Sequence, residues 1–236
     1  MRPVSANRPK GLVEIGDKSL LAHSLDALNG HDISDVILVV GYLHESIERR
    51  FGDSYENLNL TYVRNDDYAT TGSMYSLSRA RHAIGNEDAL VLESDLLFDM
   101  RAIAAILDAP HDNVLLAAGI SHSGDEVFLC ANEDGRLTDL GKALSPESRQ
   151  RAVGELAGIS RFSSRFLDAL FDSVEEDYRK GDITFHYEES VLTLSRLGHP
   201  VHVLCCENLP WIEIDKVEDL EKAQRDIYPR LRELAR

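Results

Sequence analysis

The first half of the chain alternates short apolar runs with segments of helical spacing. Residues 20–28 place apolar side chains at helical intervals, with Ser19 as the expected N-cap. Residues 35–42 form an apolar run that ends at Gly41, which is typical of a parallel strand buried on both faces. Helix and strand signals then alternate through residues 44–51, 60–63, 73–84 and 89–95. This alternation predicts an α/β fold with a doubly wound, mostly parallel, Rossmann-like sheet.

The pattern changes in the second half. Strand-like runs at 114–119, 126–131, 136–140 and 153–162 are separated by short polar turns, such as the one at 132–135. Such spacing predicts hairpins, and therefore a mixed or antiparallel C-terminal extension of the sheet. Helices are expected at 164–178, 187–197 and 217–234, and further strands at 201–206 and 211–214.

No internal repeat or low-complexity linker interrupts this pattern, so we expect a single domain over residues 1–236. The four apolar strands of the first half are expected to share one sheet with helices on both faces. Those strands end near Gly41, Asn65, Asp95 and Gly119.

Composition narrows the class of protein. The 236 residues are 43% hydrophobic, enough for one substantial core. A net charge of −16 disfavours a nonspecific nucleic-acid binder or an anionic-membrane binder, and no apolar run reaches transmembrane length. Cys130, Cys205 and Cys206 form no Cys-x-x-Cys motif, so we expect reduced thiols and a cytoplasmic location.

Two aspartates are the strongest candidates for a metal site. Ligands of doubly wound sheets bind outside the carboxyl ends of the strands, and Asp95 and Asp215 each follow an apolar strand. We expect their carboxylates to share one Mg²⁺, which takes one or two carboxylates and completes its shell with phosphates and water. For Asp215, N-capping of the helix that begins near Val217 is a competing role.

Nucleotide contacts are expected at a strand-to-helix junction that contains Gly72, Ser73 and Ser76. Free N–H groups at a helix start, and a glycine that permits close approach, suit a nucleotide. Capping by Ser73 is the alternative. Asn65 is expected either to contact the base edge or to form an Asx turn with Asp67.

An ordered set of short motifs resembles the nucleoside-triphosphate transferase family. The motifs are Arg8-Pro9-Lys10, Leu20-Leu21-x-His23, Val39-Val40-Gly41-Tyr42, Asn65-x-x-Tyr68-x-x-Thr71, Tyr75-Ser76-Leu77, Glu93-x-Asp95, Gly154-Glu155-x-x-Gly158 and Trp211-Ile212-Glu213-Ile214-Asp215. Within the family, the chain is most similar to cytidylyltransferases that activate phosphocholine or small phosphonates such as 2-aminoethylphosphonate.

The resemblance implies a reaction in which an acceptor's phosphate or phosphonate oxygen attacks the α-phosphorus of CTP and pyrophosphate leaves, with Mg²⁺ as cofactor. Lys10 would neutralise the triphosphate, and Lys142 would contact the acceptor's phosphoryl group. The alternatives are an ordinary surface lysine for Lys10 and an exposed turn lysine for Lys142. The acceptor pocket would contain Glu155, Tyr187, Glu188 and Trp211. The two aromatic rings would suit a trimethylammonium by cation–π attraction of about 0.5–2 kcal/mol, whereas carboxylates alone would suit a primary ammonium better. A core position for Trp211 is the alternative.

The family's glycine-rich loop is absent here, so the resemblance also predicts an N-terminally truncated domain. A sheet edge or an apolar groove should then be exposed beside the strand at 36–40, and an upstream strand, if restored, should raise thermal stability and CTP affinity together. Two other functions remain open: a sugar-1-phosphate nucleotidyltransferase, and a non-catalytic relative that binds nucleotide weakly. The order Tyr187-Glu188 followed by Trp211-x-Glu213-x-Asp215 favours the small-acceptor enzyme. A homodimer is a further possible partner state of the chain.

Overall fold

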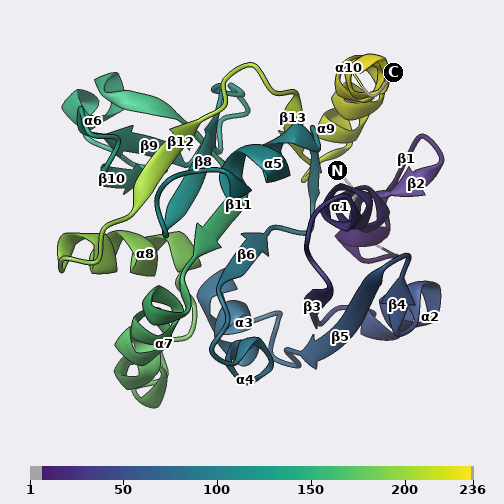
Figure 1. Ribbon diagram of the computed structural model, residues 1–236, viewed down its shortest axis with the longest axis horizontal. Coiled ribbons are helices and arrows are strands. Elements are labelled where there is room, and N and C mark those ends of the chain that lie inside the picture. The colour runs from purple at the N-terminus through teal and green to yellow at the C-terminus, as the bar shows by residue number, and fades with distance from the viewer. Residues whose placement is uncertain (1–6, 235–236) are drawn as a thin grey trace.

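The computed structural model describes residues 7–234 and has two main sheets (Figure 1). The larger sheet has the order β10-β9-β11-β8-β12, with β6 also paired to β11. Its strands are β6 (Ala89–Leu92), β8 (Val114–Ala118), β9 (Phe128–Ala131), β10 (Leu137–Gly141), β11 (Ala152–Phe162) and β12 (His202–Cys205). The smaller sheet has the order β3-β5-β4, formed by β3 (Asp35–Val40), β4 (Ser54–Tyr55) and β5 (Leu58–Arg64).

Two short antiparallel pairs and a set of helices complete the fold. The pairs join β1 (Glu14–Ile15) to β2 (Lys18–Ser19) and β7 (Leu96–Phe98) to β13 (Trp211–Glu213). The helices are η1 (Lys10–Leu12), α1 (Leu20–Asn29), α2 (His44–Phe51), α3 (Ser73–Arg79), α4 (Arg81–Ile84), α5 (Arg101–Leu107), α6 (Pro146–Gln150), α7 (Ser164–Arg179), α8 (Tyr187–Arg196), α9 (Val217–Lys222), η2 (Ala223–Ile227) and α10 (Tyr228–Leu234).

The α/β class and the mixed second half are confirmed. Strand β11 runs antiparallel to β6, β8 and β9, whereas β12 is parallel to β8. The helix expected at 217–234 is interrupted by the π-helical turn η2. The strand expected at 89–95 is shorter, because β6 ends at Leu92, and the next strand, β7, begins at Leu96. Asp95 therefore lies in a short link between two strands. No helix within residues 7–234 is long and apolar enough to cross a membrane.

The expectation that the four strands of the first half share one sheet is wrong. Strands β3 and β5 pair in the smaller sheet, whereas β6 and β8 belong to the larger one. An apolar pattern indicates which strands are buried, but it does not determine which strands are neighbours. Within residues 7–234, β3 pairs only with β5, so its other edge is unpaired, as expected for the strand at 36–40. The residues before Asn7, where the expected truncation falls, lie outside the described part of the chain.

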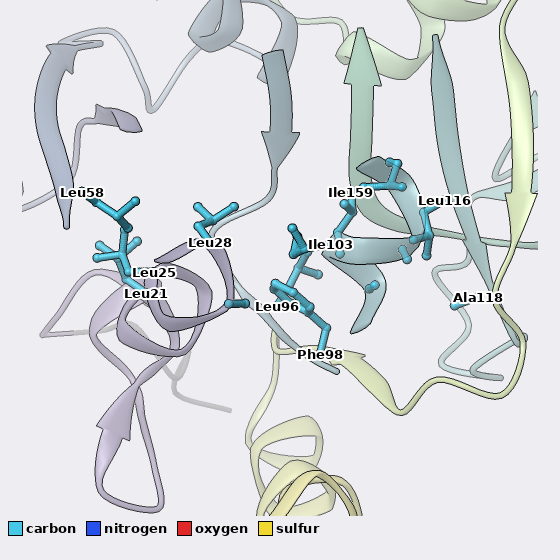
Figure 2. Close-up of a cluster of buried hydrophobic side chains, with 14 of the residues drawn as sticks. Leu21, Leu25, Leu28, Leu58, Leu96, Phe98, Ile103, Leu116, Ala118 and Ile159 are labelled. Atoms are coloured by element: carbon cyan, nitrogen blue, oxygen red, sulfur yellow. The ribbon is translucent and has the colours of Figure 1, made fainter. Parts of the chain in front are cut away.

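The two sheets are joined by apolar packing. Helix α1 contributes Leu21, Leu25 and Leu28 to a cluster that extends from the smaller sheet at Leu58 to the larger sheet at Ile159. Figure 2 shows these leucines lying between Leu58 on one side and the residues of β7, α5 and β11 on the other. This cluster includes Leu12 of η1 and Leu96 of β7, so it holds the turn that carries Lys10 near the link that carries Asp95.

Candidate active site

Lys10 is positioned by a short turn at the start of the described chain. Pro9 precedes η1, and its carbonyl accepts a hydrogen bond from the backbone N–H of Leu12 at 3.0 Å. Gly11 is buried, and a Cβ there would lie 3.4 Å from the Leu21 side chain and 3.6 Å from the Ser94 carbonyl. The turn thus packs directly against the link between β6 and β7, which brings Lys10 beside Asp95.

The pairing of β7 with β13 brings together acids that are far apart in the sequence. Leu96 lies opposite Glu213, and the backbone N–H of Ile214 donates to the carbonyl of Asp95 at 2.9 Å. Because side chains alternate along a strand, Glu213 and Asp215 project to one side while Ile212 and Ile214 are buried on the other. A backbone ladder therefore fixes the position of the Asp95 and Asp215 carboxylates.

Lys10 contacts both of these aspartates. Its Nζ donates to Asp95 Oδ2 at 2.7 Å and also to Asp215 Oδ1. Burial lowers the pKa of Lys10, but the two carboxylates outweigh it and raise that pKa well above its usual value. The expected proximity of Asp95 and Asp215 is confirmed, and their binding of a metal stays a prediction.

Asp215 does not cap a helix, which was the alternative role expected for it. The N-cap of α9 is Lys216, and the Asp219 carboxylate accepts hydrogen bonds from the backbone N–H groups of Asp215 and Lys216 at 3.1 and 2.8 Å. The Asp215 side chain is therefore available to Lys10, because Asp219 satisfies the backbone at this helix start.

Three carboxylates, which we call the acid cluster, lie beside Lys10: Glu93, Asp95 and Glu213. One oxygen of each lies within 4.8 Å of one oxygen of the other two. Burial, together with the neighbouring acids, raises the pKa of Glu93 to about 8 and that of Glu213 to about 7. Converging, partly desolvated carboxylates fit a hard divalent cation, which takes oxygen ligands and compensates their charge.

Glu93 and Glu213 are absent from the residues expected to bind the metal, although the sequence contains a signal for them. Glu93-x-Asp95 and Glu213-x-Asp215 both place acids two residues apart, the spacing that puts side chains on one face of an extended segment. The spacing therefore predicts that both acids of each pair face the site, and not the aspartate alone.

The setting of Glu93 depends on β11 and α8. Its backbone N–H donates to the Gly158 carbonyl at 2.9 Å, and its carboxylate is hydrogen-bonded to Tyr187. Gly158 has φ +68°, and a Cβ there would lie 3.1 Å from a Glu93 carboxylate oxygen. The glycine therefore provides both the left-handed backbone and the space that this buried acid requires.

Lys142 is a second lysine that interacts with the acids of the site. Its Nζ pairs with Asp125 Oδ1 at 2.8 Å, and Glu213 and Glu188 also raise its pKa. Glu188 is half-buried, and burial raises its pKa while the charge of Lys142 opposes the increase. Both Lys10 and Lys142 thus interact electrostatically with Glu213.

Three residues expected to line the acceptor pocket make contacts within the fold. Glu155 is 5% exposed and accepts hydrogen bonds from the backbone N–H and the hydroxyl of Ser121, at 2.7 and 3.1 Å. Tyr187 is 2% exposed and lies between Glu93 and Ser160, so its ring is not open to a cation. Trp211 is partly buried and packs against the core cluster. Tyr187 therefore offers no open ring to a trimethylammonium, whereas a contact with Trp211 stays a prediction.

The residues expected to contact the nucleotide have partners within the fold, and for Asn65 the structure has the alternative of an Asx turn with Asp67. Asn65 is 2% exposed, its Oδ1 accepts from the Asp67 N–H at 3.1 Å in an Asx turn, and its amide donates to Thr71 and to Ser76 at 2.9 and 3.0 Å. Gly72 donates its N–H to Ile183, and a Cβ there would lie 2.0 Å from the Phe185 carbonyl.

The Ser73 hydroxyl, at the start of α3, accepts a hydrogen bond from the backbone N–H of Tyr187 at 3.0 Å. Ser73 therefore provides a partner for the first N–H group of α8. The junction thus connects α3 to the segment before α8 through Gly72 and Ser73, and a nucleotide contact there stays a prediction.

The fold and the site define an α/β protein in which a lysine and a set of convergent carboxylates meet beside a strand pair. Such a combination of a cation and cation ligands suits polyphosphate chemistry, which depends on positioning and charge neutralisation. A model of the MobA-like NTP transferase domain family matches residues 5–232, and the chain belongs to that family.

Its relatives are nucleotidyltransferases. Over 95% of its length, the chain is 30% identical to CMP-5'-(3-aminopropyl)phosphonate synthase from Streptomyces rubellomurinus, and it spans 36% of that protein. It is 24% identical to choline-phosphate cytidylyltransferase from Streptococcus pneumoniae, with 95% of this chain and 91% of that protein covered. A solved structure of CTP:phosphocholine cytidylyltransferase from S. pneumoniae has the same fold, with a TM-score of 0.72, 22% identity, and coverage of 95% of this chain and 92% of that one.

Proposed function

We propose that this protein is a Mg²⁺-dependent cytidylyltransferase that transfers CMP from CTP to a small aminophosphonate or aminophosphate. The observation that carries the proposal is the acid cluster with Lys10 paired to Asp95, and with Lys142 close enough to influence Glu213 electrostatically. Similarity to two cytidylyltransferases, one of them acting on an aminopropylphosphonate, supports the choice of nucleotide and acceptor class.

In the proposed reaction, an acceptor oxygen attacks the α-phosphorus of CTP, a new P–O bond forms, and the bond to the β-phosphate breaks to release pyrophosphate. A bound Mg²⁺, held by Asp95 with Glu213, Glu93 or Asp215, would supply charge neutralisation for the triphosphate. Lys10 would neutralise further phosphate charge, and Lys142 would orient the phosphonate of the acceptor. The protein's contribution is positioning and electrostatic stabilisation.

The groups around Lys142 favour a primary ammonium over a trimethylammonium. Tyr187 is buried and presents no open aromatic face, and Trp211 is partly buried against the core cluster. The groups near Lys142 are instead the carboxylates Glu188 and Glu213. A primary ammonium can donate hydrogen bonds to carboxylates, whereas a quaternary ammonium has no N–H to donate.

The acceptor preference is testable by pyrophosphate release with Mg²⁺-CTP. We expect the highest kcat/KM with 2-aminoethylphosphonate or 3-aminopropylphosphonate, a value about tenfold or more lower for phosphocholine, and little turnover of glucose-1-phosphate, because one lost charge-assisted hydrogen bond is worth roughly 1.5–3 kcal/mol. A preference for glucose-1-phosphate would instead place the protein among the sugar-1-phosphate nucleotidyltransferases.

Lys142 offers a second test, through its pairing with Asp125. Both side chains are more than half exposed, so this ion pair is weak, and an acceptor phosphonate would have to displace Asp125. We expect Asp125→Asn to lower the acceptor KM about two- to fivefold, since exposed pairs are worth about 0.2–1 kcal/mol. Lys142→Met should raise the same KM at least tenfold and change the KM for CTP little. Equal changes in both constants would argue against a role for Lys142 at the acceptor.

A further inference from the structure

We propose that Lys10 is an internal cation that occupies the metal site until a triphosphate draws it away, so that divalent cation and nucleotide enter together. The inference rests on the proposed nucleotidyl transfer and concerns the order in which its components bind. Lys10 Nζ lies 2.7 Å from Asp95 Oδ2 and also contacts Asp215 Oδ1. It therefore lies where a cation shared by these two carboxylates would be bound.

Charge is the first argument for competition. Within residues 7–234, Lys10 is the only lysine or arginine that forms an ion pair with Asp95, Asp215 or a member of the acid cluster. Lys142 interacts electrostatically with Glu213 but is paired with Asp125. A divalent cation that entered while the Lys10 ammonium stayed in place would meet a like charge at contact distance, in a partly desolvated setting where repulsion is strong.

Mobility is the second argument. The backbone of the Lys10 turn is fixed, because Gly11 packs against Leu21 and Ser94, and because the N–H of Val13 donates to the Lys10 carbonyl at 2.9 Å. The Lys10 side chain is nevertheless 36% exposed. The ammonium can therefore leave the aspartates by rotation about side-chain bonds, with no movement of the fold. A triphosphate outside the cluster would offer it replacement anionic partners, and a divalent cation could then take its place.

The test measures Mn²⁺ binding without nucleotide or acceptor, by the electron paramagnetic resonance signal of free Mn²⁺. We expect the wild-type protein to bind Mn²⁺ weakly and Lys10→Gln to bind it at least tenfold more tightly, because a unit charge is removed from contact with the site. Lys10→Arg should remain weak because it keeps the charge. The matched control is Lys18→Gln, since Lys18 forms an ion pair of similar length with Asp26 away from this site, and it should leave Mn²⁺ affinity unchanged.

Two results would overturn the proposal. One is a Lys10→Gln protein whose Mn²⁺ affinity equals or falls below that of the wild type. The other is a Lys142→Gln protein that gains as much affinity as Lys10→Gln, because general electrostatics would then explain both.

Because removal of Lys10 could destabilise the fold, the melting temperature is also measured with and without Mn²⁺. Lys10→Gln should have a lowered Tm that Mn²⁺ restores, whereas Mn²⁺ alone should change the wild-type Tm little. Loss of folding that Mn²⁺ does not restore counts against the proposal. None of these measurements involves turnover, so a failure to use CTP or phosphonates would leave the result intact and would contradict only the proposed function.

Discussion

Asp95→Asn is expected to lower Mg²⁺-dependent nucleotidyl transfer by about 10²–10³-fold, the loss typical when one preorganised electrostatic group is removed from an active site. Asp95 belongs to the acid cluster and contacts Lys10, so the change removes a metal ligand and a partner of the lysine together. The fold should persist, because the contact of residue 95 with β13 is made by its backbone carbonyl. The measurement is kcat for pyrophosphate release at saturating CTP and acceptor.

The control for this substitution is Asp26→Asn. Asp26 also pairs with a lysine, at 2.6 Å from Lys18, but it lies away from the acid cluster. It should keep near wild-type activity, and both variants should show the far-UV circular dichroism of the parent. An Asp95→Asn protein that retained most of its activity would remove Asp95 from the proposed chemistry.

Glu93→Gln should stabilise the metal-free protein at high pH. Burial raises the pKa of Glu93 from its ordinary 4.5 to about 8, so the folded state binds this proton more tightly than the unfolded chain does. The free energy of unfolding therefore falls as pH rises from about 4.5 through about 8, and Glu213, with a pKa of about 7, adds to the fall. We expect Glu93→Gln to match the wild type at pH 5 and to exceed it by about 2 kcal/mol at pH 9.

The measurement is urea unfolding in the presence of a chelator between pH 5 and pH 9. Glu126→Gln serves as a control of opposite sign, because backbone hydrogen bonds lower the pKa of Glu126, and its contribution to stability is present above 4.5 and lost as pH falls. A wild-type stability that rises with pH across this range, with no gain from Glu93→Gln, would mean that Glu93 is not a destabilising buried carboxylate.

Much of the fold follows from the sequence, because its elements are determined locally. The Ser19 hydroxyl accepts from the N–H of Ala22, as expected of an N-cap, and the turn at 132–135 ends in Gly135 with φ +74°. The sequence did not predict which strands are neighbours, because β3 and β6 would be apolar whether they paired with each other or lay in separate sheets. Adjacency depends on long-range hydrogen bonding and on the packing of α1 between the sheets.

Some residues of the candidate site could likewise be predicted from the sequence, and others could not. Asp95 and Asp215 could be found because an acid at the end of an apolar strand is conspicuous. Lys10 came from the family resemblance, and the structure brings the three together. Asn65 and Tyr187 were less predictable, because a polar side chain can serve the fold or a ligand, and only burial and hydrogen-bond partners distinguish the two. Both are almost fully buried and hydrogen-bonded.

Phosphorus-31 NMR of one reaction mixture tests the proposed chemistry most directly. With protein, Mg²⁺, CTP and 2-aminoethylphosphonate, we predict loss of the CTP signals, the appearance of pyrophosphate, and one new pair of coupled resonances from a phosphonate–phosphate linkage. The Asp95→Asn protein should give none of these changes in the same time. Hydrolysis of CTP without the coupled pair, or no reaction with either aminophosphonate or with phosphocholine, would contradict the assignment of this site to cytidylyl transfer.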